Sequence, residues 1–331
     1  MVIVFQTKPS IIAGGVVAGP LEKRSTFSQY FDAIYDDERW QMKTNEQGNR
    51  KMIQEACEIV MKKTGVKDVE IDYFLGGDLV NQMTPTNFAA RELAIPFVGL
   101  FSACATSVSS VIIASLLTEV GASNLSIAGA SSQHNAVERQ FRYPINYGAQ
   151  KPATAQWTVT AAGFALIGKH QDNLPSIEAA TIGKVIDFGM DDPFHMGAAM
   201  APAAFQTIQS HLEQRKQKFY NYDLILTGDL GQLGLKLLKG MFAESGMKPE
   251  ELTLIRDAGA EFYGQDEVFQ SGASGAGCSA SVFYSYVVQQ MRAGRYNRVL
   301  LVATGALLSP LSYQQGETIP CTAHAIEITM K

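Results

Sequence analysis

Two distant segments of the chain carry nearly the same string of residues. Residues 72–79 read Asp-Tyr-Phe-Leu-Gly-Gly-Asp-Leu, and residues 223–230 read Asp-Leu-Ile-Leu-Thr-Gly-Asp-Leu. Each string has the pattern of a buried strand that runs into a loop ending in aspartate. Self-similarity of this kind indicates an internal duplication. The alternative is a chance likeness between two ordinary buried strands, so the elements that follow each string have to be compared.

The elements downstream of the two strings come in the same order. Cys104 opens an apolar helix that leads to a strand at 125–129, and Cys278 opens one that leads to a strand at 299–303. This shared order favours duplication over chance. A chain of 331 residues also exceeds the usual size of a single core. We therefore predict two halves, residues 1–172 and 173–331, which pack tightly because no Pro-, Ser- or charge-rich linker separates them.

The first half alternates between helical and strand patterns. Apolar residues recur at helical spacing over 45–63, with Asn45 as the expected N-cap and Gly65 as the stop. The following elements are predicted as a strand at 71–75, a short helix at 86–93, a strand at 96–101 and a helix from Cys104 to Glu119. Alternation with strands that are apolar throughout predicts an α/β fold whose largely parallel sheet is covered on both faces.

Composition excludes several classes of function. The chain is 46% hydrophobic and 18% charged, with a net charge of -5, so it should be ordered and has no attraction to nucleic acid. The four cysteines form no Cys-x-x-Cys pair, which signals neither disulfides nor a zinc site and fits a reducing, cytoplasmic compartment. We expect no signal peptide and no transmembrane segment, since no apolar run approaches ~18 residues.

Cys104 is the main candidate for chemistry. It stands in Leu-Phe-Ser-Ala-Cys-Ala-Thr-Ser (100–107), directly after an apolar strand and at the predicted first turn of a helix. Unpaired backbone N–H groups and the helix dipole at such a position favour a thiolate or a bound anion. The alternative is a small buried core residue, which is the commonest fate of an unpaired cysteine.

The strand followed by Ala-Cys-Ala-Thr-Ser (103–107) resembles the nucleophile corner of thiolases and ketoacyl synthases, whose halves are duplicated. Longer strings resemble one branch of that superfamily, the stage V sporulation protein AD family. These strings are Gly-Gly-Asp-Leu-Val-Asn-Gln (76–82), Gln-Phe-Arg-Tyr-Pro (140–144), Tyr-Gly-Ala-Gln-Lys-Pro (147–152), Met-Ala-Pro-Ala-Ala (200–204), Leu-Ile-Leu-Thr-Gly-Asp-Leu (224–230), Asn-Arg-Val-Leu-Leu-Val-Ala-Thr-Gly-Ala-Leu-Leu-Ser-Pro (297–310) and Ile-Pro-Cys-Thr-Ala-His (319–324).

The resemblance implies a thiolase-like fold, in which duplicated βαβαβαββ halves form a five-layer αβαβα sandwich and homodimers form through the first half. It also implies binding of pyridine-2,6-dicarboxylate (dipicolinic acid), free or as its calcium chelate, and a role in moving it into the developing spore. The implied partners are the membrane components of the stage V sporulation protein A system. Through them the chain would associate peripherally with the forespore or spore inner membrane.

The chain departs from catalytic thiolases at two positions. Their Gly-His-Pro-x-Gly segment matches residues 271–277 here, which contain Gly and Ala but no histidine, and Gly305-Ala306 stand where their second cysteine would be. Covalent catalysis needs a base within reach of the nucleophile. We therefore expect a ligand-binding protein without cofactors. The alternatives are an acyltransferase that uses Cys104 on an acyl thioester, and a structural scaffold whose pocket is a relic.

The family context adds candidate ligand-binding residues around Cys104. Asp78 and Asp229 follow matching strands and would face the ligand or its calcium, or else cap the next helix or hold a turn through backbone contacts. Gly272 belongs to a glycine-rich loop that we expect to approach the pocket floor closely. No metal site is predicted. The remaining candidates, which would offer charge or hydrogen bonds to a dicarboxylate, are His134, Arg142, Lys151 and His324.

Overall fold

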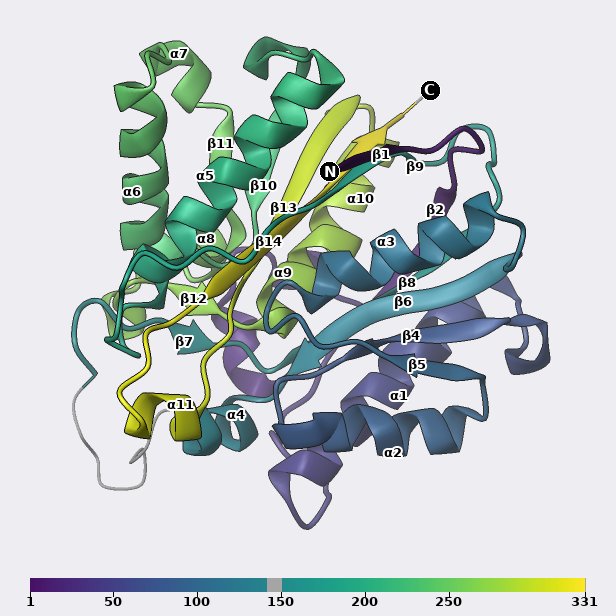
Figure 1. Ribbon diagram of the computed structural model, residues 1–331. Helices are drawn as coiled ribbons and strands as arrows, with labels where there is room; N and C mark the ends of the chain where they lie inside the picture. Colours follow the sequence, from purple (N-terminus) through teal and green to yellow (C-terminus); the bar gives the residue numbers. More distant parts are fainter. Residues whose placement is uncertain (142–150, 331) are drawn as a thin grey trace.

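The computed structural model describes residues 1–141 and 151–330 (Figure 1). The strands are β1 Val2–Val4, β2 Ser10–Ala18, β3 Ala33–Ile34, β4 Tyr73–Gly77, β5 Phe97–Gly99, β6 Leu125–Ser132, β7 Trp157–Thr158, β8 Ala161–Gly168, β9 Ser176–Ile182, β10 Leu224–Thr227, β11 Ile255–Asp257, β12 Ala273–Ser274, β13 Arg298–Ala306 and β14 Cys321–Thr329. The helices are α1 Asn45–Thr64, α2 Thr84–Leu93, α3 Thr106–Glu119, α4 His134–Phe141, α5 Met196–Arg215, α6 Gly231–Glu244, α7 Pro249–Leu252, α8 Ala258–Phe262, α9 Ala276–Val282, α10 Val288–Arg292 and α11 Pro310–Gln314.

The strand order repeats within the main sheet. One part runs β5-β4-β6-β8-β2 and the other runs β11-β10-β13-β14-β9. In both, the first three strands are parallel to one another and the last two are antiparallel to their neighbours. The two parts meet where Ser10 of β2 pairs with Ser176 of β9. The predicted boundary between residues 172 and 173 falls in the connection from β8 to β9.

Helices cover the sheet in layers that confirm the predicted thiolase-like fold. Helices α1 and α2 pack on the outer face of the first strand set, and α5 and α6 pack on the outer face of the second. Between them, α3 contacts strands of both sets and also contacts α9 (Figure 1). Three buried clusters fill the spaces between these layers. The N-terminal ends of α3 and α9 therefore meet in the middle of the molecule.

Several elements differ in detail from the sequence predictions. The sheet is mixed rather than largely parallel, because a strand buried on both faces is apolar throughout whichever way its neighbour runs. Helix α1 is capped by Thr44, whose side chain accepts a hydrogen bond from the Gln47 N–H, and not by Asn45. It ends as predicted at Gly65, which has a left-handed φ of 73°. Strand β5 keeps only three residues of the predicted 96–101.

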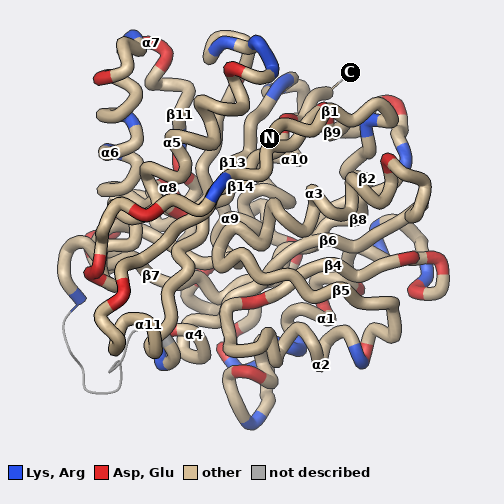
Figure 2. Tube along the Cα trace, viewed as in Figure 1, with Lys and Arg blue, Asp and Glu red and all other residues tan. Residues whose placement is uncertain are grey.

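Charged residues are distributed without a strong bias of sign. Figure 2 shows Lys and Arg interspersed with Asp and Glu along the trace, mostly in helices and loops around a core drawn in tan. This pattern agrees with the small net charge of -5. No helix in the described ranges has both the length and the apolar character needed to cross a bilayer.

Candidate functional site

Cys104 lies in a tight turn between β5 and α3. Ala103, the residue before it, has a left-handed φ of 48°, which is an uncommon conformation for a residue with a side chain. Thr106 stabilises the turn, because its Oγ1 accepts from the Ser102 N–H at 2.9 Å and donates to the Ala103 carbonyl at 2.7 Å. Cys104 therefore precedes α3, which begins at Thr106, rather than standing in its first turn as predicted.

Helix α9, in the second half of the chain, packs against this turn. The Oγ atoms of Ser107 on α3 and Ser279 on α9 lie 2.7 Å apart, and Ser279 Oγ lies 3.5 Å from the Cys104 carbonyl oxygen. Cys278, the counterpart of Cys104 in the repeat, is fully buried inside α9. Burial raises the pKa of the Cys278 thiol well above its usual value. The two halves thus present different thiol environments at the same topological corner.

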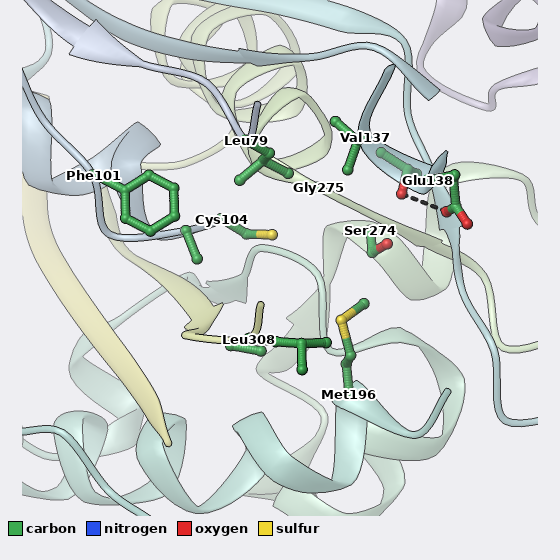
Figure 3. A pocket seen from close by; sticks show the side chains of 12 residues that line it. Leu79, Phe101, Cys104, Val137, Glu138, Met196, Ser274, Gly275 and Leu308 are labelled. Atoms are coloured by element: carbon green, nitrogen blue, oxygen red, sulfur yellow. Dashed lines mark hydrogen bonds between the residues drawn. The ribbon is translucent and has the colours of Figure 1, made fainter. Parts of the chain in front are cut away.

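Cys104 lines a pocket between the two halves (Figure 3). The pocket is narrow, with about 40 Å³ of space open to the centre of a water-sized sphere. Figure 3 shows the Cys104 sulfur pointing into this space, with Phe101 to its left, Leu308 below it, and Ser274 and Glu138 to its right. The full set of lining residues is Leu79, Phe101, Ala103, Cys104, Val137, Glu138, Thr158, Met196, Ser274, Gly275, Ala306 and Leu308.

One wall of the pocket is polar and charged. The fully buried Glu138 on α4 accepts a hydrogen bond from Thr158 Oγ1 at 2.7 Å through Oε1, and its Oε2 lies 3.4 Å from Lys151 Nζ. The Lys151 ammonium also lies 4.3 Å from the centre of the Trp157 ring, close enough for a cation–π interaction. His134 stacks on the same ring at 4.3 Å, and its Nδ1 lies 3.0 Å from the Thr158 carbonyl oxygen.

No histidine lines the pocket, although all five histidines of the chain lie within the described ranges. His134 contacts Trp157 behind the wall. His324 lies on β14, where its Nδ1 accepts the Gly183 N–H at 3.2 Å. Burial lowers the pKa of the His324 imidazole to about 4, so this side chain is neutral at physiological pH and offers no positive charge to a carboxylate.

The position of the missing second cysteine is closed by packing. A Cβ placed on Gly305 would lie 2.3 Å from the Ser102 carbonyl oxygen and 3.2 Å from the Ala105 nitrogen. These atoms belong to the turn that holds Cys104. Ala306, the next residue, lines the pocket and offers only a methyl group. The strand end that carries a proton-shuttling cysteine in thiolases is thus occupied by residues that cannot move a proton.

The two repeated aspartates bind backbone and hydroxyl groups of the protein. Fully buried Asp78 accepts hydrogen bonds from the N–H groups of Val80 and Thr86, and Thr86 lies in the first turn of α2. Asp229 accepts from the Gly275 N–H at 3.1 Å and from Thr304 Oγ1 at 2.8 Å. Neither lines the pocket. The Asp78 contacts fit the alternative in which the aspartate caps the next helix and holds a turn, whereas the Asp229 contacts join its strand end to Gly275 and Thr304, which are distant in the sequence.

The glycine loop reaches the pocket through a different residue from the one predicted. Gly275 lines the pocket, whereas Gly272 does not. Gly272 has a φ of 97°, and a Cβ there would lie 2.5 Å from the Gly259 carbonyl oxygen, so its role is close backbone packing. Arg142 lies outside the described residues. Within those residues, no group of three or more His, Cys, Asp or Glu side chains is arranged to hold a metal ion.

The structure thus places some of the predicted site residues at the pocket and others away from it. Cys104 lines the pocket, and Lys151 and His134 flank its polar wall through Glu138 and Trp157. The polar residues that complete the lining show no recognisable spacing in the sequence, because they lie on separate segments that meet only in the folded chain. The polar lining residues that the sequence did not predict are Glu138, Thr158 and Ser274.

Comparisons with known proteins add the family context. The profile of the stage V sporulation protein AD family matches residues 1–329. The Bacillus subtilis (strain 168) protein named stage V sporulation protein AD is 42% identical over 323 residues, which cover 98% of this chain and 95% of that protein.

Solved structures with the same architecture share little sequence. A Xanthomonas campestris OleA variant bound with cerulenin matches with a TM-score of 0.62 at 12% identity over 98% of this chain and 97% of that one. The 3-oxoacyl-[acyl-carrier-protein] synthase III from Aquifex aeolicus matches with a TM-score of 0.60 at 11% identity, covering 97% and 99%. A Bacillus anthracis acetyl-CoA acetyltransferase matches with a TM-score of 0.58 at 10% identity, covering 99% and 100%. At these identities the likeness shows the thiolase-like fold.

Proposed function

Because the chain belongs to the stage V sporulation protein AD family, we propose that it binds dipicolinic acid in the pocket beside Cys104 and does not turn over acyl thioesters. The observation that carries the proposal is a pocket that keeps the thiol but has no imidazole in its lining. The apolar lining residues Phe101 and Leu308 suit a flat ring, and Lys151, which contacts Glu138 of the polar wall from outside the lining, suits a carboxylate.

The missing base argues against the acyltransferase alternative. A thiol attacks a thioester efficiently when a neighbouring group takes its proton, and loss of a positioned base typically costs ~10²- to 10⁴-fold in rate. His324 is neutral but lies on β14 outside the pocket lining, and His134 is stacked on Trp157. The structural-scaffold alternative predicts that the pocket binds nothing, and direct binding measurements separate it from the proposal.

Calorimetric titration of the protein with dipicolinate tests the proposal. We expect saturable binding, with weaker binding of pyridine-2-carboxylate, which has one carboxylate fewer. Cys104→Phe, which fills the pocket, should abolish binding. Cys57→Val is the matched control, since Cys57 is buried on α1 away from the pocket and should leave binding unchanged. Heat no greater than dilution for the unaltered protein would refute the proposal.

Mass spectrometry after incubation with acetyl-CoA separates binding from catalysis. A non-catalytic pocket predicts no acetyl adduct on Cys104 on the time scale of enzymatic turnover. An adduct that forms rapidly in the unaltered protein and disappears in Cys104→Ala would favour the acyltransferase alternative. Cys104→Ala should still bind dipicolinate, because the methyl group keeps the pocket open.

We also propose that two copies pair through the first half, and that the dimer delivers its ligand to membrane-embedded stage V sporulation protein A components. Edge strand β5 exposes 42% of Val98, and the neighbouring Phe88 and Phe101 are 43% and 51% exposed, an apolar surface that supports pairing. Light scattering after chromatography tests it. Val98→Lys should yield monomers, and a monomeric unaltered protein would contradict the proposal.

A further inference from the structure

The polar, charged wall of the pocket contains a carboxylate whose negative charge would repel an anionic ligand. Glu138 is fully buried and lines the pocket, so its charge is poorly screened by water. A dicarboxylate that enters the pocket therefore meets a fixed negative charge, and the Lys151 ammonium lies next to that charge, 3.4 Å from Glu138 Oε2, outside the pocket lining. Glu138 is therefore expected to do something other than bind the carboxylates of the ligand directly.

The contacts of Glu138 point to such a role. Its Oε1 accepts from Thr158 Oγ1 at 2.7 Å, and its Oε2 faces Lys151 Nζ at 3.4 Å. The ammonium also lies over the Trp157 ring at 4.3 Å, and the lysine side chain is 21% exposed. Lys151 thus contacts a pocket-lining carboxylate and is partly exposed, although it does not itself line the pocket. A flexible lysine can exchange one oxygen partner for another by rotating its side chain.

Resting on the proposed function, we infer that Glu138 is an internal counter-ion that holds Lys151 when the pocket is empty and competes with the ligand carboxylate for its ammonium. Glu138 then lowers the affinity of the site for the ligand instead of raising it. Binding of a dianion requires the ammonium to be shared between Glu138 and the ligand. Thr158 keeps Glu138 in place during this exchange, because its hydroxyl continues to donate to Oε1.

Removing the charge of Glu138 should strengthen ligand binding, whereas removing an ordinary ligand-binding side chain weakens it. Glu138→Gln keeps the shape of the side chain and removes its charge, so dipicolinate should bind about tenfold more tightly. Lys151→Met should bind about tenfold more weakly, and Lys151→Arg should retain affinity close to that of the unaltered protein. In the Lys151→Met background, Glu138→Gln should give a smaller gain than in the unaltered protein, because competition for the ammonium has been removed and only direct repulsion between Glu138 and the ligand remains.

A matched control exists elsewhere in the chain. Glu178 is also a buried carboxylate that accepts from a lysine and a threonine, with Lys8 Nζ at 3.1 Å and Thr329 Oγ1 at 2.9 Å. It does not line the pocket. Glu178→Gln makes the same change in net charge and should leave dipicolinate affinity within about twofold. The neutral pyridine-2,6-dicarboxamide provides a ligand control, and Glu138→Gln should not improve its binding.

Titration calorimetry of each variant, with thermal unfolding as the check on folding, decides the inference. Tighter binding in Glu138→Gln that depends on Lys151 supports it. Unchanged or weaker binding in that variant overturns it while leaving the proposed function intact, since the unaltered protein still binds. Absence of dipicolinate binding in the unaltered protein instead removes the proposed function and the inference together. If Glu138→Gln does not fold, Lys151→Met decides, and undiminished affinity in that variant overturns the inference.

Discussion

The hydroxyl oxygens of Ser107 and Ser279 lie 2.7 Å apart and link the first turn of α3 to α9 across the middle of the molecule. Both side chains are fully buried. Ser107 Oγ also lies 3.4 Å from the Cys104 carbonyl oxygen. The pair therefore connects the turn that carries Cys104 to the second half of the chain.

Ser107→Ala and Ser279→Ala should each lower the free energy of unfolding by about 1–2 kcal/mol, because each leaves a buried hydroxyl with fewer partners. The double variant should lose less than the sum of the two, with a coupling of about 0.5–1.5 kcal/mol. Urea unfolding of the four proteins measures this cycle. Strictly additive losses would show that the two hydroxyls do not interact.

Glu327 on β14 should make stability depend on pH in the acid range. The carboxylate is fully buried, with Arg215 Nε at 2.9 Å and His211 Nε2 at 3.2 Å. Burial alone would raise the pKa of Glu327, but hydrogen bonds from His211 and Arg215 outweigh it and lower that pKa from 4.5 to about 2. A lowered pKa in the folded state means stabilisation that is present above pH 4.5 and is lost as the pH falls toward 2.

Glu327→Gln should therefore lower the free energy of unfolding by about 3 kcal/mol at pH 7, because it leaves the largely buried Arg215 guanidinium without its carboxylate partner. The gap between this variant and the unaltered protein should narrow from pH 4.5 downward. Urea unfolding at several pH values measures it, with Glu213→Gln as an exposed control expected to change little. A gap of constant size from neutral to acid pH would contradict the assignment.

Gly305→Ala should disturb the Cys104 turn. The new Cβ would lie 2.3 Å from the Ser102 carbonyl oxygen, so the backbone must shift, and we expect a loss of about 2 kcal/mol or more in unfolding free energy together with weaker dipicolinate binding. Gly240→Ala is the matched control, because a Cβ there meets nothing within 4 Å. Inside helix α6 that change should stabilise by roughly 0.5–1 kcal/mol. Equal effects of the two variants would exclude the steric explanation.

Asp78→Ala should act on stability and not on ligand binding. It removes the acceptor of the Val80 and Thr86 N–H groups, and loss of two such buried bonds should cost about 2–3 kcal/mol. Dipicolinate titration of the folded variant should give the affinity of the unaltered protein, with or without calcium. A large loss of affinity without a loss of stability would instead place Asp78 in the ligand site.

The fold was predictable because its signals lie within short stretches of sequence. The strings at 72–79 and 223–230 mark equivalent strands β4 and β10, and the apolar runs after Cys104 and Cys278 mark the central helices. Helix α1 ended at Gly65 as its sequence indicated. The direction of β8 and β14 was not predictable in the same way, because strands buried on both faces have the same apolar pattern in either direction.

The site was predictable from the sequence only where one continuous segment supplies both a residue and the local structure around it. Cys104 and the turn around it are contiguous, so the strand-to-helix pattern identified them. Glu138 and Thr158 lie on separate segments, and only the folded chain places their side chains 2.7 Å apart. His324 was predicted to offer a charge or a hydrogen bond, but its burial, which lowers its pKa to about 4, depends on packing between β14 and its neighbours.

The unequal surroundings of the four cysteines make Cys104 a natural attachment point for a spectroscopic reporter. Cys57, Cys278 and Cys321 have no exposed surface, and burial raises the pKa of each thiol, that of Cys321 to about 12. Only Cys104, at 8% exposure, borders an open space. A small thiol-reactive fluorophore should therefore label the native chain at one position, without engineered cysteines, and report directly on occupancy of the pocket.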